Sequence, residues 1–201
     1  MTLTATQVDQ LLRPINKTRV VRDAKGHAHV SQQDVLAHLI RVFGFGNFDI
    51  EVIRCECVFE DPYIDKEGKT KPYRYTICYR ALVRLTIRDK DGAELCHYEN
   101  GSTATAQNQT RGDAHDLAYK SAISLSVKRA AIALGDQFGL SLYNKGQLSA
   151  LVMGTQVRPA APETATATGE PVPDVQADVP QQLSLGNDEV DHEQDAVIPH
   201  E

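Results

Sequence analysis

The chain has 201 residues, of which 27 are acidic and 21 are basic, so its formal net charge at pH 7 is −6. This length suits one domain with an appendage, and no apolar run approaches the roughly 20 residues of a membrane-spanning helix. The first ten residues lack the features of a secretory signal peptide, so we expect a cytoplasmic protein without membrane contact.

The acidity is concentrated at the C-terminal end. Residues 155–201 contain ten acidic residues and one basic residue, Arg158, so their net charge is −9 and residues 1–154 carry +3. Residues 155–201 also lack Phe and Tyr, and such a segment has too little apolar surface to offset the entropy lost on ordering. We therefore expect an N-terminal extension over residues 1–10, a mildly basic domain over residues 11–154, and a disordered acidic tail.

The first basic segment covers residues 11–30, with a single acid, Asp23, among five basic residues. Residues 23–26 are a turn signal between two short extended pieces. Two interpretations remain open, a solvated edge hairpin and a phosphate-contacting arm that uses Lys17 and Arg19. The five basic residues are Arg13, Lys17, Arg19, Arg22 and Lys25.

A helix is predicted after Ser31, which begins a capping-box-like sequence. Its apolar residues Val35, Leu39, Val42 and Phe43 recur at helical spacing, and Gly44 ends it. The turn that follows contains two aromatic residues with two interpretations: Phe45 and Phe48 either fill the core, which is commoner, or stack on nucleic-acid bases.

The β-strands begin with residues 48–60, where the apolar phase changes and indicates a bulge near Val52. Residues 61–72 are predicted to form a long charged hairpin loop. The next strand, residues 73–88, alternates strictly between an apolar row and a row that carries four arginines without an acid. This pattern favours an anion groove over an ordinary solvated face. The arginines are Arg74, Arg80, Arg84 and Arg88.

A third strand over residues 94–106 contains Gly101 and precedes the longest predicted helix, residues 113–139, with Asp113 as its N-cap. The apolar stripe of this helix leaves three basic side chains on another face: Lys120, Lys128 and Arg129. The predicted fold is therefore α+β: a three-stranded antiparallel β meander on a long C-terminal helix, with an N-terminal hairpin and helix. We expect the helix and the arginine-bearing strand to frame one trough for a polyanion.

The four cysteines all lie in predicted strands. In a cytoplasmic protein they are expected to be reduced and half-buried. A zinc site that combines some of them with His97 is the less favoured alternative, because a Cys-x-Cys pair differs from the usual Cys-x-x-Cys spacing. We therefore expect no metal and no cofactor. The cysteines are Cys55, Cys57, Cys78 and Cys96.

The element order, the sequence FGFGNF at residues 43–48 and KSAISLSVKRAAIALGDQFG at residues 120–139 resemble the DNA-binding domain of the Rad-fifty-two family of single-strand annealing proteins, including its phage members. The resemblance covers residues 11–146. Its most specific part is the helix pattern K-x-A-x(5)-K-R-A-x(4)-G-x(3)-G. The matching residues here are Lys120, Ala122, Lys128, Arg129, Ala130, Gly135 and Gly139.

The resemblance implies a closed homo-oligomeric ring with single-stranded DNA in an outer basic groove, where Lys128 and Arg129 match the family's lysine and arginine. The chain departs from the family at four positions. Ile132 replaces an arginine, Asp34 a basic residue, Phe48 a tryptophan and Glu99 the first glycine of a pair whose second member is Gly101. The strand arginines, above all Arg80 and Arg84, are candidates to supply the missing charge.

The sequence contains no Gly-x(4)-Gly-Lys-Ser/Thr loop and no supported catalytic grouping, so neither nucleotide hydrolysis nor another enzymatic activity is expected. The main hypothesis is ATP-independent annealing of complementary DNA strands in recombination. The alternatives are a non-catalytic RNA-binding module and, less favoured, a metal-dependent enzyme. The acidic tail either competes with DNA for the basic groove, recruits a host replication or recombination protein, or only adds solubility.

Overall fold

The computed structural model describes residues 3–23 and 26–156. The middle of the turn predicted at residues 23–26 and the expected acidic tail beyond residue 156 lie outside the described residues. Within them, no helix combines the length and the apolar character needed to cross a membrane.

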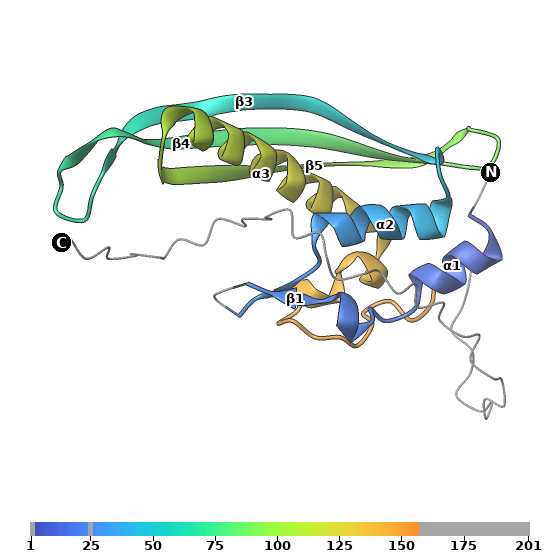
Figure 1. Ribbon diagram of the computed structural model, residues 1–201. Helices are drawn as coiled ribbons and strands as arrows, with labels where there is room; N and C mark the ends of the chain where they lie inside the picture. Colours follow the sequence, from blue (N-terminus) through green and yellow to red (C-terminus); the bar gives the residue numbers. More distant parts are fainter. Residues whose placement is uncertain (1–2, 24–25, 157–201) are drawn as a thin grey trace, which may run out of the picture.

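The upper layer of the molecule is an antiparallel sheet in the order β3-β4-β5 (Figure 1). Its strands are β3 (Phe48–Ile64), β4 (Thr70–Arg88) and β5 (Glu94–Gln109). A helix, α3 (Arg111–Ala131), lies along one face of this sheet. This arrangement confirms the predicted α+β class and the meander followed by a helix.

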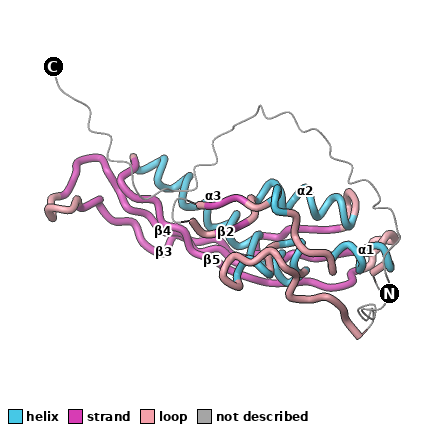
Figure 2. Tube along the Cα trace, turned by 90° about the horizontal axis from the view of Figure 1, so that it is seen from below, coloured by secondary structure: helices cyan, strands magenta, loops and turns pink. Residues whose placement is uncertain are grey.

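Strand β4 shows why the alternation in its sequence predicts its two faces. Ile77, Val83, Leu85 and Ile87 have no exposed surface, whereas the residues between them largely face away from the helix. Tyr73, the first residue of the predicted strand, does not belong to the buried apolar row. Its side chain is 87% exposed and its φ is 59°. The expected long loop is also shorter, because β3 and β4 continue to residues 64 and 70. The hairpin extends beyond the N-terminal end of α3 (Figure 2).

Both outer strands contain extra residues relative to β4, except next to the β3–β4 turn, where the register shift between Pro62 and Ile64 places the extra residues in β4. Ile53 and Val58 are extra residues in β3, where the register shifts, and the first of them confirms the bulge expected near Val52. Strand β5 gains one residue between the partners of Tyr75 and Ile77 and another near Leu95. Each bulge increases the local twist of the sheet.

Helix α3 begins and ends earlier than predicted. Its N-cap is Thr110 rather than Asp113, whose backbone N–H donates to the Thr110 hydroxyl at 3.4 Å. The helix stops at Ala131, and short 3-10 turns replace its expected last part, because Gly135 and Gly139 have φ angles of 106° and 94°. These turns cover Ile132–Leu134, Asp136–Phe138 and Ser141–Tyr143.

Small side chains bring α3 close to the sheet. Ala114, Ala118 and Ala122 recur every four residues on its buried face and are fully buried. The helix packs mainly on β4 and β5 and contacts β3 far less. Within the described residues, β3 therefore has less contact with α3 than the other two strands.

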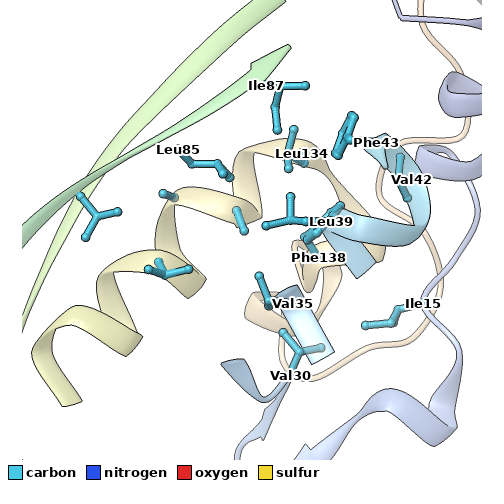
Figure 3. Packing of buried hydrophobic residues seen from close by; sticks show 14 of the residues in the cluster. Ile15, Val30, Val35, Leu39, Val42, Phe43, Leu85, Ile87, Leu134 and Phe138 are labelled. Atoms are coloured by element: carbon cyan, nitrogen blue, oxygen red, sulfur yellow. The ribbon is translucent and has the colours of Figure 1, made fainter. Parts of the chain in front are cut away.

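The second layer is built around α2 (Gln32–Phe43), which Ser31 caps and Gly44 ends, as predicted. Its residues Val35 and Leu39 point into a core formed with Leu85 and Ile87 of β4 (Figure 3). Leu134 and Phe138 complete this core from the 3-10 turns after α3.

The N-terminal segment wraps around α2. A helix that the sequence analysis does not predict, α1 (Ala5–Leu11), has a Thr4–Gln7 capping box, and the Gln7 side chain donates to the Val42 carbonyl at 3.1 Å. A 3-10 turn (Lys17–Arg19) then leads into the predicted hairpin. Its strands are β1 (Val21–Arg22) and β2 (Ala28–His29).

Candidate nucleic-acid interface

A large open groove lies between the β1–β2 hairpin and α3, and small residues of β5, Ser102 and Ala104, form part of its wall. The residues of α3 that line it are on the side of the helix turned away from β3. Leu117, Leu125 and Ile132 give the groove an apolar part. Its other lining residues are mainly polar or charged, so the groove suits a ligand with both charged and flat apolar parts.

Five cations line the groove against two acids, Asp23 and Asp116. They come from three separate parts of the chain and so converge only in the folded protein. Asp116 accepts a hydrogen bond from the Lys120 ammonium at 2.6 Å, which offsets one of the five charges. The five cations are Arg22, Lys120, Lys128, Arg129 and Lys145.

Lys128 and Arg129 occupy the last turn of α3, where the helix dipole favours positive charge. The Arg129 guanidinium donates to the Asn100 side chain of β5 at 3.4 Å, and the Asn100 amide donates to the Arg129 carbonyl at 3.5 Å. These contacts hold an exposed guanidinium beside the wall formed by β5. The three predicted α3 cations therefore share one groove.

The predicted arginines of β4 lie on the opposite face of the sheet, where carboxylates of β3 and β5 meet them. Arg80 forms an ion pair with Glu56, and this hydrogen bond lowers the pKa of Glu56. Arg84 contacts Glu99 at 2.6 Å, which raises the pKa of the guanidinium, and Glu51 at 3.5 Å.

The remaining two arginines of the row are also engaged. Arg88 contacts Asp49 at 2.6 Å, and Arg74 donates to the Asn108 carbonyl at 3.4 Å. The expectation that the arginine row and the helix frame one trough is therefore wrong, because the sheet separates them. The acids that pair with three of the arginines belong to neighbouring strands, so the sequence of β4 alone could not reveal them.

Three further predicted contacts lie at different places. Arg19 is turned inward, and its guanidinium donates to Asp34 and Gln137. Lys17 is exposed at the surface. Phe45 is 85% exposed and so does not fill the core, whereas Phe48 is partly buried against it.

The positions that depart from the family have local explanations. Asp34 is the partner of Arg19, and Glu99 is the partner of Arg84. Ile132 lines the groove as an apolar residue where the resemblance implies an arginine.

Two groove cations had no assigned role in the sequence analysis. The sequence identifies Arg22 only as one of the five basic residues of the N-terminal segment. The sequence pattern does not indicate a role for Lys145, because this residue reaches the groove only through the path of the 3-10 turns after α3. His27 and His29 of the hairpin also line the groove. In the described part of the chain, no group of three or more His, Cys, Asp or Glu residues is placed to hold a metal ion.

A comparison with protein families matches residues 4–158 to the family described as Rad52/22 family double-strand break repair protein. None of the curated proteins matches the chain. The family match covers most of the described fold, including the sheet, α3 and the groove between α3 and the hairpin. The chain therefore belongs to the Rad52/22 family, whose members act in DNA recombination and repair.

Proposed function

We propose that the protein binds single-stranded DNA in the groove between α3 and the β1–β2 hairpin and anneals complementary strands. The observation that carries the proposal is the convergence of cations from three chain segments on one groove, in a chain that belongs to a DNA repair family. Lys128 and Arg129 are the central phosphate ligands. Arg22 and Lys145 extend the positive surface toward the hairpin.

The groove explains binding without sequence preference. Phosphates held by lysine and arginine release counterions, and contacts of this kind carry no information about base identity. A strand gripped by its backbone keeps its base edges available to a complementary strand. Annealing in this form requires no nucleotide hydrolysis, in agreement with the lack of a phosphate-binding loop motif in the sequence.

Assembly into a homo-oligomeric ring would place many such grooves on one track. Each additional groove binds a strand that is already held, so its contact is intramolecular and overall affinity rises without any new type of contact. The modest positive charge of a single groove is then sufficient for a long strand.

The test is a pair of double variants measured with a fluorescent oligonucleotide at moderate salt. Lys128→Ala with Arg129→Ala removes two groove cations and is expected to weaken binding at least tenfold. Arg80→Ala with Arg84→Ala removes the same charge from the opposite face and is expected to leave binding within about twofold. The reverse pattern would reject the groove and favour the arginine face.

An RNA strand of the same sequence provides the second arm of this experiment. Tighter binding of RNA than of DNA, together with no acceleration of annealing, would replace the annealing proposal by an RNA-binding one. Equal phosphate binding with faster DNA annealing supports the proposal.

A further inference from the structure

One flat side chain of the groove is exposed although the fold does not use it. Of the residues that line the groove, Phe138 and Tyr143 carry a phenyl or phenol ring. Phe138 has no exposed surface and belongs to the core, whereas Tyr143 is 68% exposed. The aromatic contacts within the described part of the chain involve other rings and not that of Tyr143. The groove therefore presents a phenol ring to its ligand.

The 3-10 turns after α3 fix the backbone that carries this ring. Leu142, the residue before Tyr143, is 5% exposed and belongs to the core. The backbone N–H of Tyr143 donates to the Leu140 carbonyl at 3.3 Å. The backbone N–H of Asn144 donates to the Ser141 carbonyl at 3.0 Å. Tyr143 is thus held at the groove by a buried neighbour on one side and a closed turn on the other.

The backbone after Tyr143 has an uncommon conformation. Lys145 has a φ of 57°, in the left-handed region that residues other than glycine rarely adopt, and residues held there are often found at ligand-binding sites. A Cβ atom on the next residue, Gly146, would lie 3.4 Å from the Cβ atom of Ala28 in β2, so the turn lies against the β1–β2 hairpin (Figure 1). In this conformation Tyr143 and Lys145 both line the groove.

The wall of the groove that α3 forms is the more positive one. It carries three cations, Lys120, Lys128 and Arg129, and one acid, Asp116. Asp116 accepts a hydrogen bond from Lys120, so the attraction for phosphates is strongest at the other two cations. The phosphates of a bound strand are therefore expected on the α3 side.

The opposite wall, formed by the β1–β2 hairpin and residues 143–146, is richer in flat side chains. It has two cations and one acid, Asp23, together with Tyr143 and two imidazole rings. The Nδ1 atom of His27 lies 3.0 Å from the Asp23 carboxylate, and 73% of the His27 side chain is exposed. Nucleic-acid bases stack on rings of both kinds. A strand that turns its phosphates to α3 turns its bases to this wall.

We propose that Tyr143 stacks on a base of the bound strand while Lys128 and Arg129 hold its phosphates. The inference rests on the proposed function and adds which wall of the groove receives the bases. Stacking uses the face of a base and leaves its hydrogen-bonding edge free for a complementary strand. It is also independent of base identity, because every base has a π-face.

The first test compares an ordinary oligonucleotide with an abasic strand of the same length, which keeps the phosphates and lacks the bases. Tyr143→Ala in the full-length protein is expected to weaken binding of the ordinary strand about tenfold, a typical effect of removing one stacking residue. It is expected to leave binding of the abasic strand within about twofold, because the phosphate contacts remain. An equal loss for both strands would overturn the proposal, since the ring would then support the groove and not a base.

Variants that keep a ring separate stacking from the hydroxyl group. Tyr143→Phe and Tyr143→Trp are expected to bind the ordinary strand within about twofold of wild type, because each retains a π-face. Tyr73→Ala is the matched control, because Tyr73 is 87% exposed and lies on β4 outside the groove. Circular dichroism confirms folding of each variant. A loss in Tyr143→Phe as large as that in Tyr143→Ala would overturn the stacking role.

The salt dependence of binding provides an independent measurement. Stacking releases no counterions, so Tyr143→Ala is expected to keep the wild-type slope of log affinity against log salt concentration. A slope that becomes shallower by about 0.7 would mean that one phosphate contact is lost, and it would overturn the assignment of Tyr143 to a base.

Photocross-linking locates the contact directly. Iodouracil in an oligonucleotide couples on irradiation to aromatic side chains that stack on it, and we expect a cross-linked peptide that contains Tyr143. Cross-linking at Phe45 and not at Tyr143 would place the bases on another surface and overturn the inference.

The same variants distinguish this inference from the proposed function. If Lys128→Ala with Arg129→Ala weakens binding of both strands and Tyr143→Ala weakens neither, the inference fails and the proposed function stands. If the double variant and Tyr143→Ala both bind as wild type does, the groove itself is rejected.

Discussion

Arg19 donates to both carboxylate oxygens of Asp34, with distances of 3.0 and 2.8 Å from its Nε and Nη2 atoms. The same guanidinium donates to the side chain and the backbone carbonyl of Gln137, and Gln137 donates to the carbonyls of Arg13 and Pro14. Only 12% of the Arg19 side chain is exposed. This network ties the N-terminal arm to α2 and to the turns after α3.

Arg19→Ala should therefore act on stability. The carboxylate of Asp34 would lose its main partner in a largely buried place, so we expect the free energy of unfolding in urea to fall by about 3 kcal/mol. Lys17→Ala, two residues away and exposed, should change it by less than about 0.5 kcal/mol. If Arg19→Ala instead unfolds like wild type and only weakens DNA binding, Arg19 is a phosphate ligand.

Gly101 is required by the close approach of two strands. A Cβ atom at this position would lie 2.8 Å from the Ala81 carbonyl oxygen, which belongs to the backbone of β4. Gly101→Ala should lower the free energy of unfolding by about 1–3 kcal/mol, because the strands must shift. Gly112→Ala in α3 is the control, since a Cβ atom there would meet nothing within 4 Å outside the backbone of its own helix, and alanine favours helix. Equal stability of the two variants would contradict this prediction.

His38 is expected to make the stability of the protein depend on pH. The ring is 3% exposed, neither nitrogen has a hydrogen-bond partner, and burial, together with the charges of Arg19 and Arg41, lowers the pKa of His38 to about 3. The unfolded chain binds this proton near pH 6.5, whereas the folded protein does not. Stability is therefore unaffected by this group above about pH 6.5 and falls as the pH decreases toward 3.

The loss from His38 alone should reach roughly 2 kcal/mol at pH 5. His38→Leu removes the titrating group and keeps an apolar contact with Phe138, so the difference in stability between pH 7 and pH 5 should shrink by that amount. Unfolding in urea at pH 7 and at pH 5 measures this difference in stability. Identical pH dependence in wild type and His38→Leu would refute the prediction that His38 causes the loss of stability at pH 5.

The salt dependence of DNA binding should report the groove cations directly. Each phosphate contact contributes about 0.9 to the slope of log affinity against log salt concentration for duplex DNA and about 0.7 for single strands. Lys128→Ala with Arg129→Ala should make this slope shallower by about 1.4, which corresponds to two lost phosphate contacts. A lower affinity with an unchanged slope would mean that these residues act through the fold and not through phosphates.

Of the three roles that the sequence leaves open for the acidic tail, we propose competition with DNA for the groove. A stop after Gln156 removes the acidic segment but keeps Leu151 and Val152, whose backbone N–H groups donate to Asp136 at 2.9 and 3.0 Å. We expect this shortened protein to bind single strands more tightly, with the difference largest at low salt. Unchanged affinity at low salt would leave the tail without a competitive role.

The sequence predicts an element correctly where the spacing of its apolar residues matches the face that is buried in the fold. The alternation in β4 and the helical spacing of α2 both follow from one face of each element meeting the core. Helix α3 was predicted too long, because an apolar stripe continues through Leu134 although Gly135 cannot continue the helix. For α1, a short amphipathic segment gave too weak a pattern to identify.

The candidate site was only partly predictable, for a different reason. Lys128 and Arg129 are adjacent in one predicted helix, so the sequence already places their backbones side by side. Whether Arg84 is available to a ligand depends on Glu99 and Glu51, which reach it only in one register of three strands. Register is a property of strand pairing over long sequence distances, and the alternation within one strand does not contain it.

Between Phe48 and Pro62 of β3, and again along β5, each outer strand has two more residues than the stretch of β4 that it pairs with. A ribbon built in this way cannot lie flat and must adopt a propeller-like saddle shape. The pitch of this sheet is then determined largely by where Ile53 and Val58 interrupt a single strand.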